Sequence, residues 1–119
     1  MSFLKIFRNR ALNKLTLSLL LICPSMPLIA QTIDADLAET FARKNDCFKC
    51  HAISKRKKAP SYVEIAAKYK DKADAHHVLY LHLTGNPLVK LDDNDEPHSA
   101  PKIKDKADLD NLISWILTR

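Results

Sequence analysis

The chain has 119 residues, of which 28% are charged and 46% are hydrophobic, and its formal net charge is +5. This length allows one small domain. The positive charge does not indicate a nucleic-acid-binding protein, because four of the 19 Lys and Arg residues lie within residues 1–30, which contain no Asp or Glu. The remaining residues carry 15 basic and 14 acidic side chains. We therefore expect no nucleic-acid partner.

Residues 1–30 have the pattern of a secretory signal peptide. Basic side chains precede an apolar run over residues 15–22, and prolines and small residues then lead to a cleavage site after Ala30. The run is too short, and too interrupted by proline, for a stable membrane span. We expect a cleaved signal at 1–30, an exported domain at 31–119 and a periplasmic location. An uncleaved membrane anchor is the alternative.

A Cys-Phe-Lys-Cys-His motif at residues 47–51 is the strongest chemical signal in the chain. Two thiols at this spacing can each add to one vinyl group of a haem, and the histidine that follows is carried under the iron. A redox-active cysteine pair needs a βαβ setting and a zinc site needs two further ligands, and neither pattern is visible. The motif predicts one covalent haem c, with Cys47 and Cys50 as thioether donors and His51 as an iron ligand.

The segments on either side of the motif both predict helices. Residues 34–45 begin with Asp34 as a cap and end with basic side chains, and they place Leu37 and Phe41 on one apolar face. This helix leads directly into the motif. Residues 61–69 begin with a Ser-x-x-Glu capping box, which predicts a second helix there.

Two further helices are expected, separated by a long acidic loop. Residues 74–84 end at Gly85, which we expect to close the helix in a left-handed conformation. Residues 88–103 lack hydrophobic periodicity and indicate a loop, whereas residues 106–117 carry an apolar stripe of helical period with Trp115 beside it. No strand is expected. The residues expected to be buried on the third helix are Val78, Leu79, Leu81 and Leu83.

The loop after the motif is strongly basic and ends at a proline. A run of this kind is usually a solvated loop; the alternative is a positive rim that steers an acidic redox protein to the edge of the haem. The carbonyl of Pro60 is a candidate acceptor for the second ring nitrogen of His51. The basic residues expected to guide a redox partner are Lys49, Lys55, Arg56, Lys57 and Lys58.

These features resemble the class I c-type cytochromes, in particular the short bacterial single-haem kind. The resemblance rests on the motif, on the placing of Pro60 and Tyr62 after it, and on the terminal segment 112–117. It implies an all-α fold of about four helices around one haem c, and it adds Pro60 and Tyr62 to the haem-binding residues. The first and last helices should cross, with Phe41 and Trp115 as candidates for the crossing.

The chain departs from this family at two positions near the haem. Ala59 stands where glycine is usual, which adds a methyl group beside the cofactor. The resemblance also implies a methionine as the sixth iron ligand, but both methionines of the chain lie within residues 1–30. His98, in a proline-flanked loop before the last helix, is the expected replacement. The competitors are His76, His77, His82, Asn86, Lys90, Lys102 and an empty position.

The sequence therefore predicts a periplasmic single-haem electron-transfer protein, not an enzyme, with His51 and His98 on the iron. A second imidazole in place of methionine should lower the haem potential. The alternatives are a haem redox subunit of a periplasmic enzyme complex and a gas-binding or sensing protein with a displaceable sixth ligand. The carboxylates at residues 92–96 are expected to favour a protonated imidazole when His98 is free.

Overall fold

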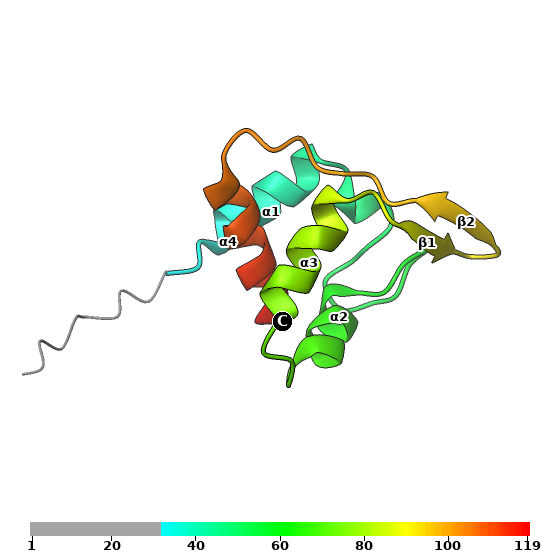
Figure 1. The fold of residues 1–119 in the computed structure, drawn as a ribbon, viewed down its shortest axis with the longest axis horizontal. Coiled ribbons are helices and arrows are strands. Elements are labelled where there is room, and N and C mark those ends of the chain that lie inside the picture. Colours follow the sequence, from blue (N-terminus) through cyan, green and yellow to red (C-terminus); the bar gives the residue numbers. More distant parts are fainter. Residues whose placement is uncertain (1–31) are drawn as a thin grey trace, which may run out of the picture. The chain divides into compact units, whose positions relative to one another are not determined.

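The computed structural model describes residues 32–119, so the expected signal peptide at 1–30 and both methionines lie outside the described residues. Within the described part, the chain forms four α-helices and a short β-hairpin that extends from them (Figure 1). None of these helices is long and apolar enough to cross a membrane. In chain order the elements are α1 (Ala35–Lys44), the 3-10 turn η1 (Cys47–Lys49), α2 (Tyr62–Tyr69), α3 (Ala75–Thr84), β1 (Leu88–Leu91), β2 (Asn94–Pro97) and α4 (Lys106–Leu117).

The ends of the helices follow from local hydrogen bonds that the sequence predicts. A carboxylate oxygen of Asp34 accepts a hydrogen bond from the N–H of Leu37 at 2.9 Å, which caps α1. At the start of α2, the N–H of Ser61 donates to Glu64 at 2.7 Å, and the N–H of Glu64 donates to the Ser61 hydroxyl at 3.2 Å. Both halves of the expected capping box are therefore present, and all four predicted helices are confirmed.

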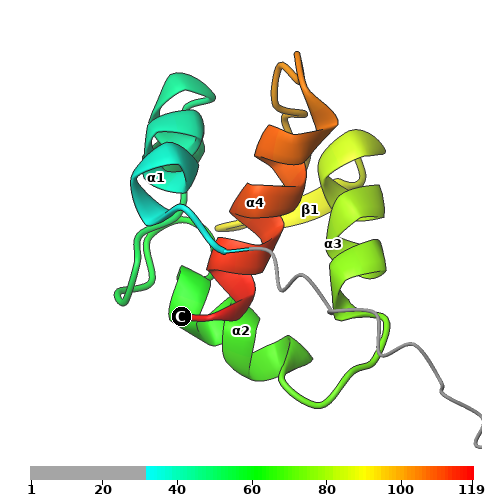
Figure 2. The ribbon, with the colours of Figure 1, turned by 90° about the vertical axis from the view of Figure 1, so that its left-hand side faces the viewer.

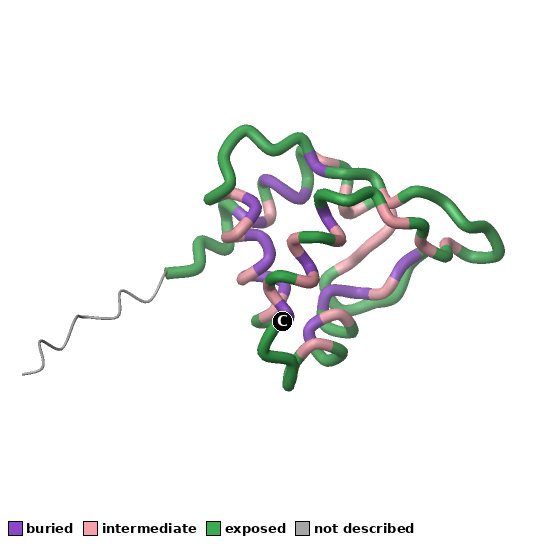
Figure 3. Tube along the Cα trace, viewed as in Figure 1, coloured by how far each residue is buried: buried purple, intermediate pink, exposed green. Residues whose placement is uncertain are grey.

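The core of the described residues is built around α4, which lies between α1 and α3 and above α2 (Figure 2). Its apolar stripe is almost fully buried, and Trp115 is 0% exposed. Phe41 on α1 belongs to the same core, so both residues expected at the crossing of the terminal helices are buried there. Figure 3 shows the buried residues gathered on the helices and the exposed residues along the tip of the hairpin.

One apolar residue expected in the core is instead exposed. Leu81 is 53% exposed, and Leu37, which was placed on one apolar face with Phe41, is 42% exposed. On α1 the side facing α4 carries Ala38, Phe41 and Ala42, and at 3.6 residues per turn Leu37 falls outside that arc. Leu81 lies outside the buried face of α3 for the same reason. The prediction was wrong because an apolar pair at helical spacing does not show which side of the helix meets a neighbour.

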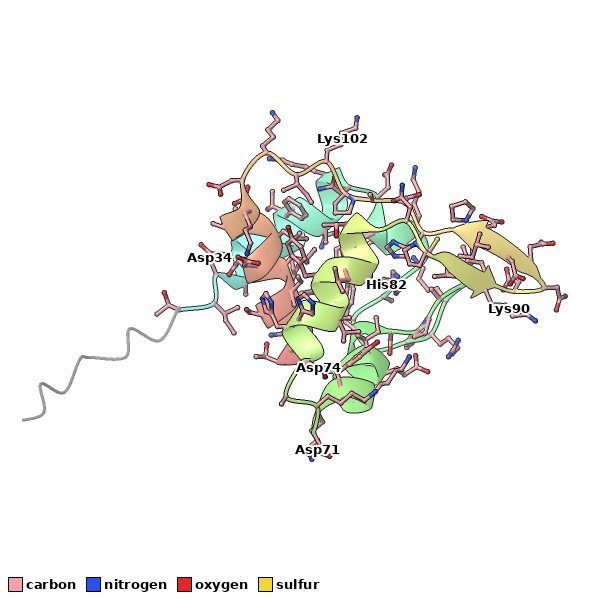
Figure 4. The ribbon with its side chains drawn as sticks, in the orientation of Figure 1. Asp34, Asp71, Asp74, His82, Lys90 and Lys102 are labelled. Atoms are coloured by element: carbon pink, nitrogen blue, oxygen red, sulfur yellow. The ribbon has the colours of Figure 1, made fainter. Side chains whose placement is uncertain are left out.

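Two asparagine side chains tie the first helix to the end of the chain. The N–H of Asp34 donates to the Asn111 side-chain oxygen at 2.9 Å, and the Asn111 amide donates to the Asp34 carbonyl at 2.8 Å. Near the other end of α1, the N–H of Lys102 donates to the side-chain oxygen of Asn45 at 2.7 Å. Asp34 and Lys102 mark these two links in Figure 4. The links fix α1 to α4 and to the loop that precedes it.

The expected loop at residues 88–103 is partly a β-hairpin, which corrects the expectation that no strand is present. Strands β1 and β2 pair antiparallel, from Leu88 opposite Pro97 to Leu91 opposite Asn94. The turn between them places Asp92 in the left-handed region, with φ of 52°, a conformation that Asp tolerates better than most residues. The hairpin has no alternating apolar pattern because every residue of β2 is exposed.

The end of α3 differs from the expected left-handed glycine cap. Gly85 has φ of −96°, and the left-handed residue is Asn86, with φ of 47°. Glycine is needed at position 85 for space, because a Cβ atom there would lie 2.8 Å from the carbonyl oxygen of Leu81. The backbone of Gly85 therefore lies close to the carbonyl of Leu81 at the end of α3, and the chain changes direction one residue later, at Asn86.

Replacing Asn111 with alanine removes both hydrogen bonds between α1 and α4. We expect the free energy of unfolding of the haem-loaded protein to fall by about 1 to 2 kcal/mol, measured by denaturant unfolding. Asn94→Ala, on the exposed strand β2, is the matched control and should stay within about 0.5 kcal/mol of the parent protein. A loss no larger than that of the control would show that the crossing does not depend on Asn111.

The capping box should make stability depend on pH. Its hydrogen bonds to Ser61, and then the charge of Arg56, lower the pKa of Glu64. A carboxyl with a lowered pKa stabilises the fold above its unfolded pKa, and this contribution disappears as the pH falls through the folded pKa. Glu64→Gln should therefore be less stable than the parent protein at neutral pH, and the two should converge below about pH 4. The control is Asp71→Asn, in the turn after α2. If the difference in free energy of unfolding between the parent protein and Glu64→Gln does not change with pH, the charge of Glu64 does not stabilise α2.

Candidate haem site

The motif at residues 47–51 is folded into one tight turn at the end of α1. Asp46 reverses the chain with φ of 60°, and the N–H of His51 donates to the carbonyl of Cys47 at 3.0 Å. Cys47 and Cys50 are half-buried and are not joined by a disulfide bond. The turn therefore presents two free thiols and an imidazole within a single short segment, as covalent haem attachment requires.

The surroundings of the first thiol keep it neutral at ordinary pH. Burial raises the pKa of Cys47, which also contacts the hydroxyl group of Tyr62. Burial and the neighbouring Cys47 in turn raise the pKa of Tyr62. Within residues 32–119, no group of three or more Cys, His, Asp or Glu side chains is arranged to hold a metal ion. The two cysteines therefore lack the further ligands of a zinc site.

His51 is held in one tautomer and one orientation by its neighbours. Its Nδ1 lies 2.6 Å from the carbonyl oxygen of Pro60, so the N–H at Nδ1 donates to that carbonyl. The other nitrogen, Nε2, is then left with a lone pair for a metal. The ring also stacks on Tyr62, with 5.4 Å between centroids and 15° between planes. The hydrogen bond expected from the sequence is thus present.

The support for His51 continues into the core. The ring of Tyr62 meets Trp115 edge-on, with 5.2 Å between centroids. The loop that carries Pro60 is anchored by a hydrogen bond from the N–H of Ala59 to the carbonyl of Cys50, at 3.1 Å. Ala59, which departs from the usual glycine, is 4% exposed and so is accommodated within the fold. These contacts connect the proximal histidine to α2 and α4.

His98 lies where the hairpin returns to the helices. It follows β2 directly, and its backbone N–H donates to the carbonyl of Pro87, just before β1, at 2.8 Å. Its side chain is half-buried, and its Nδ1 is buried without a hydrogen-bond partner. The centroids of the His51 and His98 rings are 6.3 Å apart, with 49° between their planes. The structure therefore brings these two imidazoles together from segments 47 residues apart.

The protonation of His98 differs from the sequence expectation. Burial first, and then the neighbouring His82 and His51, lower the pKa of His98 to about 4. The carboxylates at residues 92–96, which were expected to favour the protonated ring, are exposed on the hairpin. Desolvation outweighs their attraction, so His98 is neutral at ordinary pH. A neutral imidazole is the form that binds a metal.

The site fits an iron porphyrin. Two imidazoles on opposite sides of one iron, each with a nitrogen about 2 Å from the metal, have centroids roughly 6 Å apart, which agrees with the observed pair. Within residues 32–119, three buried side-chain atoms lack hydrogen-bond partners: Nδ1 of His98, Oδ1 of Asp110 and the indole N–H of the fully buried Trp115. The Asp110 oxygen lies 3.9 Å from Nε2 of His76, whereas the imidazole and the indole can each donate to an added acceptor. Buried polar groups are rarely left unpaired, and haem brings two carboxylates that can accept hydrogen bonds.

Of the other candidate iron ligands in the described part of the chain, only His82 has a ring in contact with one of the two imidazoles, His51 and His98. His82 is half-buried on α3, and its ring contacts that of His98, with 4.6 Å between centroids and 61° between planes. His76 instead approaches Asp110, with 3.9 Å between Nε2 and Oδ1, and His77 is exposed. The alternatives Asn86, Lys90 and Lys102 are all exposed. Sequence reasoning undervalued His82, although its helical spacing from Ala75 and Leu79 places it on the buried face.

The five basic residues around the motif are exposed, but three of them already have partners. Lys49 pairs with Asp46 at 3.0 Å, and Arg56 pairs with Glu64 at 3.1 Å. The ammonium group of Lys57 donates to the carbonyl of Phe48 at 2.6 Å. The two ion pairs reduce the net positive field of the surface, whereas the hydrogen bond of Lys57 leaves its charge in place. Among contacts within residues 32–119, the two members of the run that make neither kind are Lys55 and Lys58.

Comparison with known proteins agrees with this geometry. The family model described as cytochrome c matches residues 35–119. Cytochrome c-552 of Nitrosomonas europaea is 36% identical over 85 residues, which cover 71% of this chain and 77% of that protein. The crystal structure of the class 1 cytochrome MtoD from Sideroxydans lithotrophicus ES-1 matches with a TM-score of 0.71 and 40% identity, over 73% of this chain and 97% of that one. Wild-type cytochrome c552 of Nitrosomonas europaea matches with a TM-score of 0.53 and 36% identity, over 71% of this chain and 98% of that one.

The family match covers every element of the site, and the motif at Cys47 and Cys50 is the one that carries a covalent haem c. The chain therefore belongs to the cytochrome c family: it is a class I c-type cytochrome, a single-haem electron-transfer protein.

Proposed function

We propose that this cytochrome is an exported, periplasmic electron carrier whose iron is held between His51 and His98. The observation that carries the proposal is the pair of facing imidazoles, whose centroids are 6.3 Å apart. Cys47 and Cys50 form the thioether links. Pro60 and Tyr62 bind the cofactor indirectly, because they fix the ring of His51. Haem supplies a one-electron iron couple in this site.

The side chains determine the properties of that couple. The hydrogen bond from His51 to Pro60 makes the ligating nitrogen more basic, which stabilises the oxidised iron. A second imidazole at His98 lacks the effect by which methionine raises the potential of many cytochromes c. With His51 and His98 both holding the iron, small molecules would be excluded from it. These features favour a carrier of lowered potential that performs no bond chemistry, and they disfavour a gas-binding protein.

The proposed location follows from residues 1–30 and from the cofactor. The segment has the pattern of a secretory signal, and haem is attached to this type of motif outside the cytoplasm. Redox partners would dock at the haem edge beside Lys49 and the basic run at residues 55–58. Within residues 32–119, the side chains of Lys55 and Lys58 make neither an ion pair nor a hydrogen bond, so they are free to turn toward a negatively charged partner and should contribute most to its attraction.

Electron paramagnetic resonance of the ferric protein tests the ligand assignment. The parent protein should give a low-spin signal of the bis-imidazole type. His98→Ala should lose it and show a high-spin signal or a different low-spin signal, because one imidazole is gone. His77→Ala, which removes an exposed histidine from α3, is the control and should leave the spectrum unchanged.

Two outcomes would contradict the assignment. A high-spin parent protein would mean that the sixth position is open, and rapid binding of carbon monoxide to the ferrous form would then favour the gas-binding function. A bis-imidazole signal that survives His98→Ala would assign the second ligand to another histidine. The double variant His82→Ala, His98→Ala would then identify His82 if the signal disappeared only there.

The rate of oxidation by ferricyanide tests electrostatic steering with a simple anionic oxidant. Replacing both Lys55 and Lys58 with glutamate should slow the bimolecular reaction severalfold at low ionic strength, and the difference should shrink as salt screens the charges. The double variant Lys70→Glu, Lys72→Glu, at the far end of α2 and in the turn after it, gives the same change of net charge and should have a smaller effect. Equal rates for these two variants, or a rate insensitive to salt, would contradict a role for the basic run.

A further inference from the structure

The two imidazoles of the proposed iron site are held in different ways. His51 has a hydrogen bond to Pro60 and a stacked neighbour in Tyr62, so both the position and the rotation of its ring are fixed. His98 is fixed through its backbone, which donates to Pro87, but its buried Nδ1 has no hydrogen-bond partner. Within residues 32–119, the backbone of the adjacent Ser99 lies near this ring but makes no hydrogen bond of normal geometry to Nδ1, so hydrogen bonding sets the rotation of the His98 ring only weakly.

A third histidine, His82, lies beside the ring of His98 and can restrain its rotation by contact. The ring of His82 meets the ring of His98 edge-on, with 4.6 Å between centroids and 61° between planes. This is within the range of favourable contacts between planar rings. Figure 4 shows His82 on α3, on the side toward the hairpin strands. No other aromatic ring within residues 32–119 has its centroid as close to that of His98.

The position of His82 is itself well determined. It falls on the helical face of α3 that also carries the buried residues Ala75, Leu79 and Leu83, and it lies two residues before Thr84, the last residue of the helix. Its side chain is half-buried, and burial lowers its pKa, so the ring is neutral beside its neighbour. A ring carried by a packed helix can therefore restrain one that follows a hairpin.

We propose that His82 is a positioning residue that sets the rotation of the His98 imidazole, and with it the angle between the two imidazole planes at the iron. This inference rests on the proposed His51 and His98 ligation. The angle matters because each imidazole interacts with one set of iron orbitals according to the direction of its plane. Neighbours that orient a metal ligand are known to tune the metal in this way. His82 would act through His98, without touching the iron.

The test compares the ferric spectra of three variants with that of the parent haem-loaded protein. His82→Ala removes the ring, and His82→Phe keeps a flat ring of similar reach without nitrogen atoms. His77→Ala, on the exposed side of the same helix, is the matched control. We expect His82→Ala to remain low-spin, since His98 still binds, but with a shifted and broadened largest g value. His82→Phe should restore a narrow line, and His77→Ala should match the parent protein.

The outcomes separate this inference from the proposed ligation. If the parent signal is lost in His98→Ala, the ligation holds, and an unchanged g value in His82→Ala then overturns only the positioning role. A broadened signal in His82→Phe, as broad as in His82→Ala, would also overturn it, because ring contact would not be the cause. If His82→Ala becomes high-spin while His98→Ala stays low-spin, His82 is itself the ligand, and both assignments fail.

Discussion

The hydrogen bond between Nδ1 of His51 and the carbonyl of Pro60 joins the haem-binding motif to the residue that precedes the cap of α2. It closes the loop between the motif and α2, and it leaves the other ring nitrogen free to bind iron. The stacked ring of Tyr62 and the buried Trp115 extend this support into the core. A marginal core of this size gains from a large apolar cofactor, so folding and haem binding reinforce each other.

The distal half of the site depends on the hairpin. In the proposed ligation, His98 takes the place of the methionine that residues 32–119 do not contain, and β1 and β2 return the chain so that the centroids of the His98 and His51 rings are 6.3 Å apart. The hydrogen bond from the His98 backbone to Pro87 closes the base of the hairpin. Desolvation keeps the imidazole neutral, despite the acidic residues on the exposed part of the hairpin. Backbone pairing would thus place the proposed ligand, and burial would keep it in the form that binds a metal.

The helices, the caps at the starts of α1 and α2, and the His51 to Pro60 bond were predictable, because each arises from residues close together in sequence. The hairpin was not, since β2 is exposed throughout, β1 is only partly buried, and their Asp-Asp turn lacks the usual glycine. The burial of Leu81 was predicted wrongly because the packing partner selects the buried side of a helix. The contact of His82 with His98 and the lowered pKa of His98 depend on that tertiary packing and appear only in the structure.

The most direct test of the site is to count the histidine nitrogens bonded to the ferric iron. Protein made with isotopically labelled histidine and unlabelled haem allows pulsed electron paramagnetic resonance to separate imidazole nitrogens from those of the porphyrin. We predict two labelled nitrogens with strong coupling, one from His51 and one from His98. A single strongly coupled labelled nitrogen would contradict bis-histidine ligation and would leave the sixth position to another group.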